Sequence, residues 1–480
     1  MTIEVEALHA ALRQDFYAFI QKSFETVNPG QEFLPNWHIE AIAWHLEQCI
    51  RGDIKRLIIE MPPRHLKSHC ASVALPAWVL GNDPTRRVVC ASYSEDLASF
   101  FSRQTREILT ASWYRSVFPS TRLSRKKNTE TEVVTTKGGY RYSASVGGTL
   151  TGRGGNLIII DDPIKADGGM SEAERKRVIE WYERTVFSRL DNKKDDVIIV
   201  VMQRIHVEDL AGYLESQGGW TVLKLPAIAP EAASIPISQG EVHEREKGEL
   251  LHPDREDKKV LDEAKETLGS HGFQAQYQQD PVPPGGNMIK RKWFKRYDKR
   301  PDRDCFSNTV QSWDTAMETG EQTSYTVATT WGVRENRYYL LDVFRDRLGF
   351  PSLKKKAIRH ACTWGADTIL IEKAALGHAL LQSLGQETGL PVIAVSPKHD
   401  KETRAAQVTP LIEARRVFLP EEASWLAEFE QEILAFPDGK HDDQVDSLTH
   451  FLRWADKRDH GQPQLTCTLV GGPRRLVRYS

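Results

Sequence analysis

A segment rich in proline and glycine, residues 280–286 (DPVPPGG), interrupts the 480-residue chain. Such density marks a linker between parts that fold separately. A chain of this length is too long to fold around a single hydrophobic core, so we expect two or three domains. We therefore predict a domain over residues 1–280, a basic linker over 281–303, a second domain over 304–460 and a basic tail over 461–480.

Composition excludes several classes of protein. Hydrophobic residues make up 40% and charged residues 27%, as in ordinary globular proteins. The net charge of -2 means that any basic surface must be local. Six cysteines are scattered without close pairs, which favours a reducing cytoplasm over secretion. The chain shows no signal-peptide pattern and no apolar run near the ~18 residues of a membrane span, so we expect no membrane partner.

The first half alternates short apolar runs with helical periodicity. Strands are predicted at 56–61, 87–93, 156–161 and 197–202, and helices at 67–80, 94–110 and 171–190. Gly138 and Gly139 separate two further strands, 133–136 and 140–145, as in a hairpin. Because buried parallel strands read as continuous apolar runs, this alternation predicts an α/β sheet with helices on both faces.

The second half begins differently. Three strands joined by short polar turns, 309–314, 325–332 and 337–344, predict an antiparallel meander. Strands at 367–373 and 391–397 then alternate with helices at 352–364, 376–385 and 401–415, before a last helix at 442–456. The pattern predicts a mixed sheet.

A first group of chemically active residues follows two strands of the first half. Lys67 and Ser68 stand where a strand becomes a helix, and the apolar run 157–160 ends in Asp161 and Asp162. A phosphate-binding loop needs a lysine for the β- and γ-phosphates of ATP and a hydroxyl for Mg²⁺. The partner strand supplies one acid that holds Mg²⁺ and a second that polarises the attacking water. Together the two motifs predict ATP hydrolysis.

The loop departs from the usual phosphate-loop pattern, because Met61 and Leu66 fill its two glycine positions. The alternative for the loop is a plain strand–turn–helix. The alternative for Asp161 and Asp162 is a strand end with solvated acids before Pro163.

A second group is acidic. Asp314 and Glu372 each end a predicted strand, and Asp442, Asp443 and Asp446 open the last helix beside His441. Cutting a phosphodiester with two Mg²⁺ or Mn²⁺ ions requires several carboxylates from different elements, and a helix N-terminus tolerates such charge. The set predicts a metal-dependent nuclease. Any of the three helix acids could be the principal ligand, and we favour Asp443; each acid alone could simply be solvated.

The predicted linker is strongly basic. Its bases are Lys290, Arg291, Lys292, Lys295, Arg296, Lys299 and Arg300, interleaved with Trp293, Phe294 and Tyr297. Basic side chains neutralise phosphates, and aromatic rings stack on nucleobases. The segment is therefore a candidate DNA contact. The alternative is an amphipathic segment that packs its aromatic rings between the domains.

Several of these motifs resemble one family. Pro62–Ser68 is similar to the proline-initiated phosphate loop of the large terminase subunits of tailed bacteriophages. The likeness extends to Gly147–Gly154, Leu157–Pro163, Met202-Gln203-Arg204 with His206 and Glu208–Leu210, and Trp37-His38. The run Gly439–Asp446 resembles the nuclease motif of the same family. The likeness covers residues from about 35 to 455.

The resemblance implies roles for individual residues. Trp37 and His38 would contact the base of ATP, and Arg64, His65, Lys67 and Ser68 its phosphates. Arg64 and Arg153 would sense or stabilise γ-phosphate charge, one of them in the same subunit or across a subunit boundary. Gln203 and Arg204 would bind the nucleotide at the motif that couples hydrolysis to movement. Family members usually have glycine where Leu66 stands, and many have glutamate where Asp162 stands, which puts the loop geometry and the water-activating acid in question.

The resemblance also implies a fold and a function. The fold would be a P-loop ATPase with an ASCE-type parallel sheet, followed by a ribonuclease H-like nuclease domain. The protein would move double-stranded viral DNA into a procapsid and cut concatemers in the host cytoplasm. Its partners would be a small terminase subunit and the portal protein, on which it assembles as a ring. The alternatives are a cellular repair translocase–nuclease and a non-catalytic DNA-binding adaptor.

Overall fold

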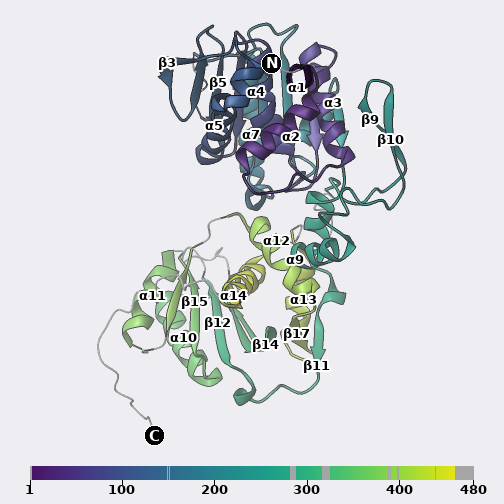
Figure 1. Cartoon of the computed structure of the whole chain (residues 1–480). Helices are drawn as coiled ribbons and strands as arrows, with labels where there is room; N and C mark the ends of the chain where they lie inside the picture. The colour runs from purple at the N-terminus through teal and green to yellow at the C-terminus, as the bar shows by residue number, and fades with distance from the viewer. Residues whose placement is uncertain are drawn as a thin grey trace. The chain divides into compact units, whose positions relative to one another are not determined.

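The computed structural model describes residues 3–148, 150, 152–281, 288–315, 325–373, 375–387, 389, 391–396, 399–437, 439 and 441–459. The chain divides into two compact units, Met1–Pro283 and Pro284–Ser480 (Figure 1). The predicted tail over 461–480 and most of the proline- and glycine-rich segment lie outside the described residues.

The first unit is built from helices around one large sheet. Its elements are α1 (Ile3–Gln14), α2 (Phe16–Val27), α3 (Trp37–Arg51), β1 (Arg56–Glu60), the π-helical η1 (His69–Ala74), α4 (Leu75–Asn82), β2 (Arg87–Ser92), α5 (Glu95–Thr110), α6 (Ser112–Val117), β3 (Leu123–Asn128), β4 (Glu132–Thr135), β5 (Tyr140–Ser145), β6 (Leu157–Asp161), η2 (Ala166–Gly168), α7 (Glu172–Trp181), η3 (Tyr182–Val186), η4 (Phe187–Arg189), β7 (Val197–Met202), α8 (Leu210–Gln217), β8 (Thr221–Lys224), β9 (Ala233–Ser238), β10 (Glu241–Arg245) and α9 (Lys258–Gln276).

The sheet of the first unit has the order β3-β4-β5-β2-β6-β7-β1-β8. All pairs from β5 to β8 are parallel, and β3 and β4 add an antiparallel edge. On β6, Leu157 and Ile159 pack into the core shared with α1–α6, whereas Ile158 and Ile160 pack against α7 and α8. Because successive side chains point to opposite faces, a continuous apolar run covers both. The predicted α/β sheet is confirmed.

Local signals position several helices of this unit. The Ser94 side chain accepts a hydrogen bond from the Leu97 amide and caps α5, and Ser171 caps α7 in the same way. The helix predicted from residue 67 instead starts as π-helical η1. There, buried Arg141 donates to the Ser72 carbonyl oxygen at 3.0 Å, and such an inserted side chain disturbs the helical ladder.

The second unit is built from helices around a second sheet. Its elements are η5 (Arg291–Trp293), β11 (Lys295–Tyr297), η6 (Arg303–Cys305), β12 (Asn308–Asp314), β13 (Thr326–Arg334), β14 (Arg337–Asp346), α10 (Phe350–Trp364), β15 (Thr368–Glu372), α11 (Ala375–Glu387), β16 (Val392–Val395), α12 (Lys401–Glu413), β17 (Val417–Pro420), α13 (Leu426–Ala435) and α14 (Asp443–Asp459).

This second sheet is mixed, with the order β11-β17-β14-β13-β12-β15-β16. β12, β13 and β14 form the predicted antiparallel meander, and β15 joins β12 in parallel. Helices α12, α13 and α14 pack on one face, while α10 and α11 pack on the other (Figure 1). The acids at the ends of β12 and β15 therefore share one edge of the sheet.

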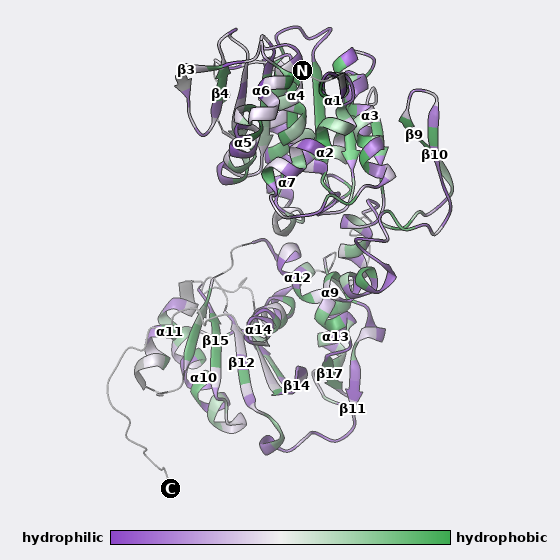
Figure 2. Cartoon of the chain, in the orientation of Figure 1, coloured by the Kyte–Doolittle hydropathy of each residue, from purple (hydrophilic) through white to green (hydrophobic). Residues whose placement is uncertain are grey.

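The basic segment predicted as a linker forms part of the second unit. β11 pairs with β17 at the edge of the sheet, and Ile289 and Phe294 are buried in its core. Figure 2 shows β11 as hydrophilic beside the more hydrophobic inner strands. The short length of β11 and its Lys295 are typical of an exposed edge strand.

Sequence periodicity missed several other elements, including the β9–β10 hairpin and the short strand β17. Among the residues described, no helix has the length and apolarity that crossing a membrane requires.

Candidate active sites

The loop between β1 and η1 adopts an unusual backbone conformation. Arg64 and Leu66 both have φ of 65°, in the left-handed region that glycine normally occupies. Leu66 therefore takes the conformation of the missing glycine despite its side chain. The loop leaves Arg64 exposed at its tip and Lys67 buried.

The two motifs predicted to form one site meet in the structure. Lys67 Nζ lies 3.4 Å from Asp162 Oδ2, and Ser68 Oγ donates to Asp161 Oδ1 at 3.0 Å. Ser72 Oγ donates to Asp161 Oδ2 at 2.6 Å, a contact that the sequence analysis missed. Ser72 follows Ser68 by four residues on one helical face, which is the signal that could have found it.

The electrostatics of this pair favour a cation. Asp161 is buried, and burial together with the neighbouring Asp162 carboxylate raises the pKa of Asp161 to about 7. Hydroxyl and carboxylate oxygens are ligands that Mg²⁺ prefers, so Ser68 and Asp161 fit the predicted role. Asp162 has φ of 43°, and its Oδ1 accepts a hydrogen bond from the Gln203 amide at 3.2 Å. The backbone of Gln203 thus orients the acid.

Arg204, a predicted nucleotide-binding residue, is held by acidic side chains of its own chain. Its guanidinium is buried and bonded to the carboxylates of Glu60 at 3.1 Å, Asp209 at 2.9 Å and Glu215 at 3.0 Å. Its amide donates to Gln279 Oε1 at 2.9 Å. A guanidinium with three carboxylate partners is held in place, so Arg204 joins β1, β7 and α8.

Arg153 also lies elsewhere within its own chain. Its guanidinium pairs with Glu132 on β4 at 2.8 Å and lies over the rings of Tyr140 and Tyr142. β4 is three strand positions from β6, roughly 14 Å at the usual spacing of about 4.8 Å. The structure therefore does not bring Arg153 to Asp161 of the same chain.

Trp37 and His38 lie beside the loop but are covered by other residues. His38 Nε2 lies 3.3 Å from the His65 carbonyl oxygen, and the Trp37 ring stacks on His243 of β10 at 4.2 Å between centroids. The rings of His38, His65 and His252 form a buried cluster. Burial lowers the pKa of His65 to about 4, so the loop histidine is neutral at physiological pH.

The acids of the second unit gather where the neighbouring strands β12 and β15 end. Trp313 pairs with Ile371, so Asp314 and Glu372 are neighbours, and their side chains share a hydrogen bond. Burial raises the pKa of both carboxyls, and the nearby Asp446 raises each further; Asp443 also contributes at Asp314. Two carboxyls that share a proton are the donors that a divalent cation would deprotonate and bind.

Helix α14 brings the remaining acids to the same edge. The side chain of Asp443 is half-buried, and burial followed by repulsion from Glu432 raises its pKa. Asp446 is buried and bonded to Arg404 and Lys401 of α12. Buried His450, one turn after Asp446, lies with Nε2 3.5 Å from Glu372 Oε2. The four-residue spacing could have revealed His450, whereas no sequence signal pointed to Lys401 and Arg404.

These acids differ in whether their oxygens are available to bind a metal ion. Among the described residues, no three or more histidine, cysteine, aspartate or glutamate side chains are placed so that they could hold a metal ion as they stand. Asp314, Glu372 and Asp443 have the donor chemistry. Burial raises the pKa of all three, and nearby carboxylates, Asp446 for Asp314 and Glu372 and Glu432 for Asp443, raise it further. Asp442 and Asp446 fit poorly because basic side chains already hold their oxygens. His441 contacts the Tyr325 ring.

The basic segment is partly committed to structure. Arg291 and Arg296 both pair with Glu430, which is buried. Lys290, Lys292 and Lys295 are exposed, and the ammonium groups of Lys290 and Lys295 lie over the rings of Trp293 and Phe418. The segment thus contains two arginines that are ion-paired to a buried glutamate and a set of exposed lysines.

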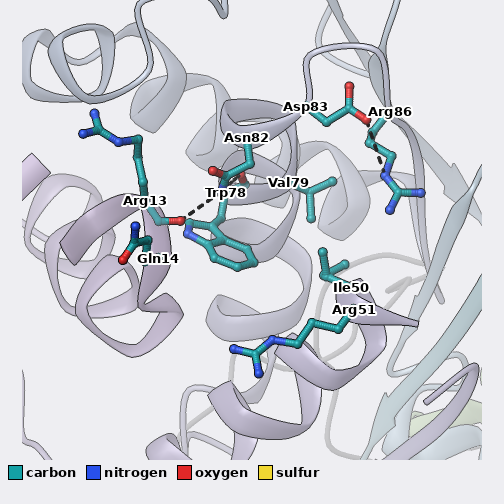
Figure 3. A pocket seen from close by; sticks show the side chains of 9 residues that line it. All are labelled: Arg13, Gln14, Ile50, Arg51, Trp78, Val79, Asn82, Asp83 and Arg86. Atoms are coloured by element: carbon teal, nitrogen blue, oxygen red, sulfur yellow. Dashed lines mark hydrogen bonds and ion pairs between the residues drawn. The ribbon is translucent and has the colours of Figure 1, made fainter. Parts of the chain in front are cut away.

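A cavity of about 420 Å³ in the first unit contains no residue of either site. Its arginines are bonded within the chain: Arg13 to the Val117 carbonyl, Arg51 to Glu47 and Arg86 to Asp83. Figure 3 shows the guanidinium groups of Arg13 and Arg86 pointing to different sides. The cavity is lined by Arg13, Gln14, Ile50, Arg51, Trp78, Val79, Asn82, Asp83 and Arg86.

Known proteins place this chain in a structural class. Residues 311–453 match the family model of the terminase RNaseH-like domain. The large terminase of the thermophilic bacteriophage D6E is similar over 88% of this chain and 99% of its own, with a TM-score of 0.55 and 11% identity. Its complex with ADP gives the same coverage and identity with a TM-score of 0.52. A comparison with curated proteins gave no match.

The fold and the two groups of acids define a P-loop ATPase fold followed by a ribonuclease H-like fold, as the sequence predicted. More particularly, the second unit carries a terminase RNaseH-like domain, and the whole chain has the fold of the bacteriophage large terminases. The resemblance stated from the motifs is confirmed.

Proposed function

We propose that this protein is a terminase large subunit that hydrolyses ATP to move double-stranded viral DNA into a procapsid and that cuts concatemeric DNA. One observation carries the proposal. A single chain joins a loop in which Lys67 meets Asp162 and Ser68 meets Asp161 to a terminase RNaseH-like domain with Asp314 and Glu372 at one sheet edge.

The first site has the parts that phosphoryl transfer needs. Mg²⁺, when bound, supplies charge neutralisation at the β- and γ-phosphates. Ser68 and Asp161 would hold it, and Lys67 would turn from Asp162 to the phosphates of ATP. Asp162, oriented by the Gln203 amide, would then accept a proton from the attacking water. Neutral His65 keeps additional positive charge out of the loop.

The second site has the parts of a metal-dependent nuclease. A divalent cation, when bound, supplies Lewis-acid stabilisation of charge on the phosphodiester. Asp314, Glu372 and Asp443 would hold it. Neutral His450 lies beside Glu372, and Arg404 pairs with Asp446. Such contacts orient the acids, as residues behind a metal site commonly do.

The proposal extends to partners through the fold. A large terminase that packages DNA needs a component that selects viral DNA, for which we propose a small terminase subunit, and a docking point on the capsid, for which we propose the portal protein. Assembly as a ring on the portal in the host cytoplasm follows from the same proposal. The lack of a base-reading module in the sequence predicts cutting that tolerates different sequences.

Two substitutions in the full chain test the function. Lys67→Ala should abolish ATP turnover and leave Mg²⁺- or Mn²⁺-dependent cutting of plasmid DNA largely intact, because Lys67 serves only the first site. Asp314→Asn should abolish cutting and spare ATP turnover, because it removes a ligand charge without changing volume.

Matched controls are Lys137→Ala and Asp304→Asn, which remove the same charges at exposed positions. Both should behave like wild type. Wild-type protein without ATP turnover would support the non-catalytic adaptor instead, and equal loss of both activities in a folded Lys67→Ala variant would contradict two separate sites.

A further inference from the structure

A lysine occupies the centre of the acidic cluster in the second unit. Lys401 is the first residue of α12, and its Nζ lies 2.6 Å from Asp442 Oδ1 and 2.9 Å from Asp446 Oδ2. One ammonium group therefore bridges two carboxylates that come from the start of α14. Both are charge-assisted contacts, which are stronger than hydrogen bonds between neutral groups.

Arg404 takes the remaining oxygen of the inner acid. Its Nη2 contacts Asp446 Oδ1, and its Nη1 donates to the His399 carbonyl at 2.9 Å. Both oxygens of Asp446 are thus occupied by basic side chains. The Asp446 side chain is only 4% exposed, whereas that of Lys401 is 43% exposed. The ammonium group of Lys401 therefore lies on the solvent side of Asp446.

This arrangement leaves three acids for divalent cations. Asp314 and Glu372 share a hydrogen bond, and Asp443 is close enough to raise the pKa of Asp314. Two ions about 4 Å apart would need further carboxylate oxygens between them. The further acids beside these three are Asp446 and Glu432. Lys401 bridges Asp446 to Asp442, and both oxygens of Glu432 accept hydrogen bonds from Gln444.

We propose that the Lys401 ammonium group takes the place of a second divalent cation, so that the site binds one ion together with a built-in positive charge. The inference rests on the proposed nuclease function. Lys401 is a positioning residue that holds Asp442 and Asp446 from a side chain that is 43% exposed.

Metal binding tests this without any enzymatic reaction. Mn²⁺ bound to full-length protein is counted by titration with electron paramagnetic resonance, in the absence of nucleotide and DNA. Lys401→Met, which keeps the side-chain length and removes the charge, should bind one more ion per chain than wild type. The affinity for that ion should rise about tenfold or more, the scale of one close charge pair. Lys401→Arg and the control Lys355→Met, an exposed lysine of α10, should keep the wild-type count.

A wild-type count in folded Lys401→Met would overturn the inference. A second measurement needs no variant: the cutting rate of wild-type protein should rise with the first power of Mn²⁺ concentration, and a second-power dependence would also overturn it. The proposed nuclease fails separately if Asp314→Asn leaves the Mn²⁺ count unchanged and wild type does not cut DNA.

Discussion

Leu66 shows how a single residue can satisfy a loop that usually requires glycine. Its φ of 65° costs a non-glycine residue about 1 kcal/mol. Its side chain is partly buried against the main core of the first unit, and this packing offsets the strain. The backbone conformation needed to turn amide groups inward is therefore present without the glycine.

The order of two substitutions at this position should be opposite to that in a helix. Leu66→Gly loses the packing of the side chain but relieves the backbone strain. Leu66→Ala loses the packing and keeps the strain. We expect the free energy of unfolding of Leu66→Gly, measured by urea denaturation, to exceed that of Leu66→Ala by about 1 kcal/mol. At exposed Glu266 of α9, the alanine variant should instead be the more stable by about 1 kcal/mol. The same order at both positions would contradict a strained Leu66.

Asp443 and Asp446 illustrate why equivalent acids can differ. Both lie in the first turn of α14, but Asp446 is tied to Arg404 and Lys401 whereas Asp443 faces carboxylates. The preference for Asp443 as a metal ligand stays a prediction, and the ion pairs of Asp446 support it.

At the scale of elements, Arg204 links the end of β1 to α8 and to the end of the first unit. Glu60, Asp209 and Glu215 surround its guanidinium, and its amide binds Gln279, which has φ of 54°. The Gln203 amide next to it orients Asp162. Asp162, the proposed catalytic acid, and the end of this unit are thus held by adjacent residues of one loop.

The acid at the end of β1 makes stability depend on pH. Burial, and then the neighbouring Glu215, raise the pKa of Glu60 from 4.5 to about 8. The folded state therefore binds more protons than the unfolded state between these values, and wild type loses stability as pH rises from about 4.5 to about 8. Glu60→Gln cannot titrate, so its free energy of unfolding relative to that of wild type should rise across this window by up to about 5 kcal/mol, at about 1.36 kcal/mol for each unit of the pKa difference. Urea denaturation at several pH values measures it; a constant difference would argue against a raised pKa.

The basic segment 290–300 should separate into two functions. Replacing Lys290, Lys292 and Lys295 by alanine should weaken DNA binding and flatten its log–log salt slope by about 0.9 for each lost phosphate contact, with little change in melting temperature. Replacing Arg291 and Arg296 should lower the free energy of unfolding by about 1–3 kcal/mol, because buried Glu430 loses both partners.

A salt titration of DNA binding and a thermal melt on both variants distinguish these effects. If the lysine variant melts early with an unaltered salt slope, the segment serves packing alone.

At the scale of the whole molecule, each hydrophobic core cluster among the described residues draws its members from one unit. We therefore expect fragments 1–283 and 284–480 to fold separately. The first should hydrolyse ATP without cutting DNA, and the second should cut DNA without ATP. Thermal melts of the fragments should reproduce two transitions of the full chain; an unfolded second fragment would contradict this.

The sequence alone determined the parts of the fold that depend on local pattern. Continuous apolar runs identified β6 and β7 as buried parallel strands, short polar turns identified the β12–β14 meander, and Ser94 and Ser171 identified helix starts. The acids Asp161, Asp314 and Glu372 were found because each follows an apolar strand.

Tertiary structure decided which side chains meet. Arg204 and Arg153 have the residue type expected near phosphates, yet carboxylates distant in sequence hold them elsewhere. Lys401 meets Asp446 because α12 packs beside α14, and β11 joins the sheet by pairing with β17. Charge pairing and sheet-edge pairing depend on distance in space, and sequence spacing encodes that distance only within one helix or one strand.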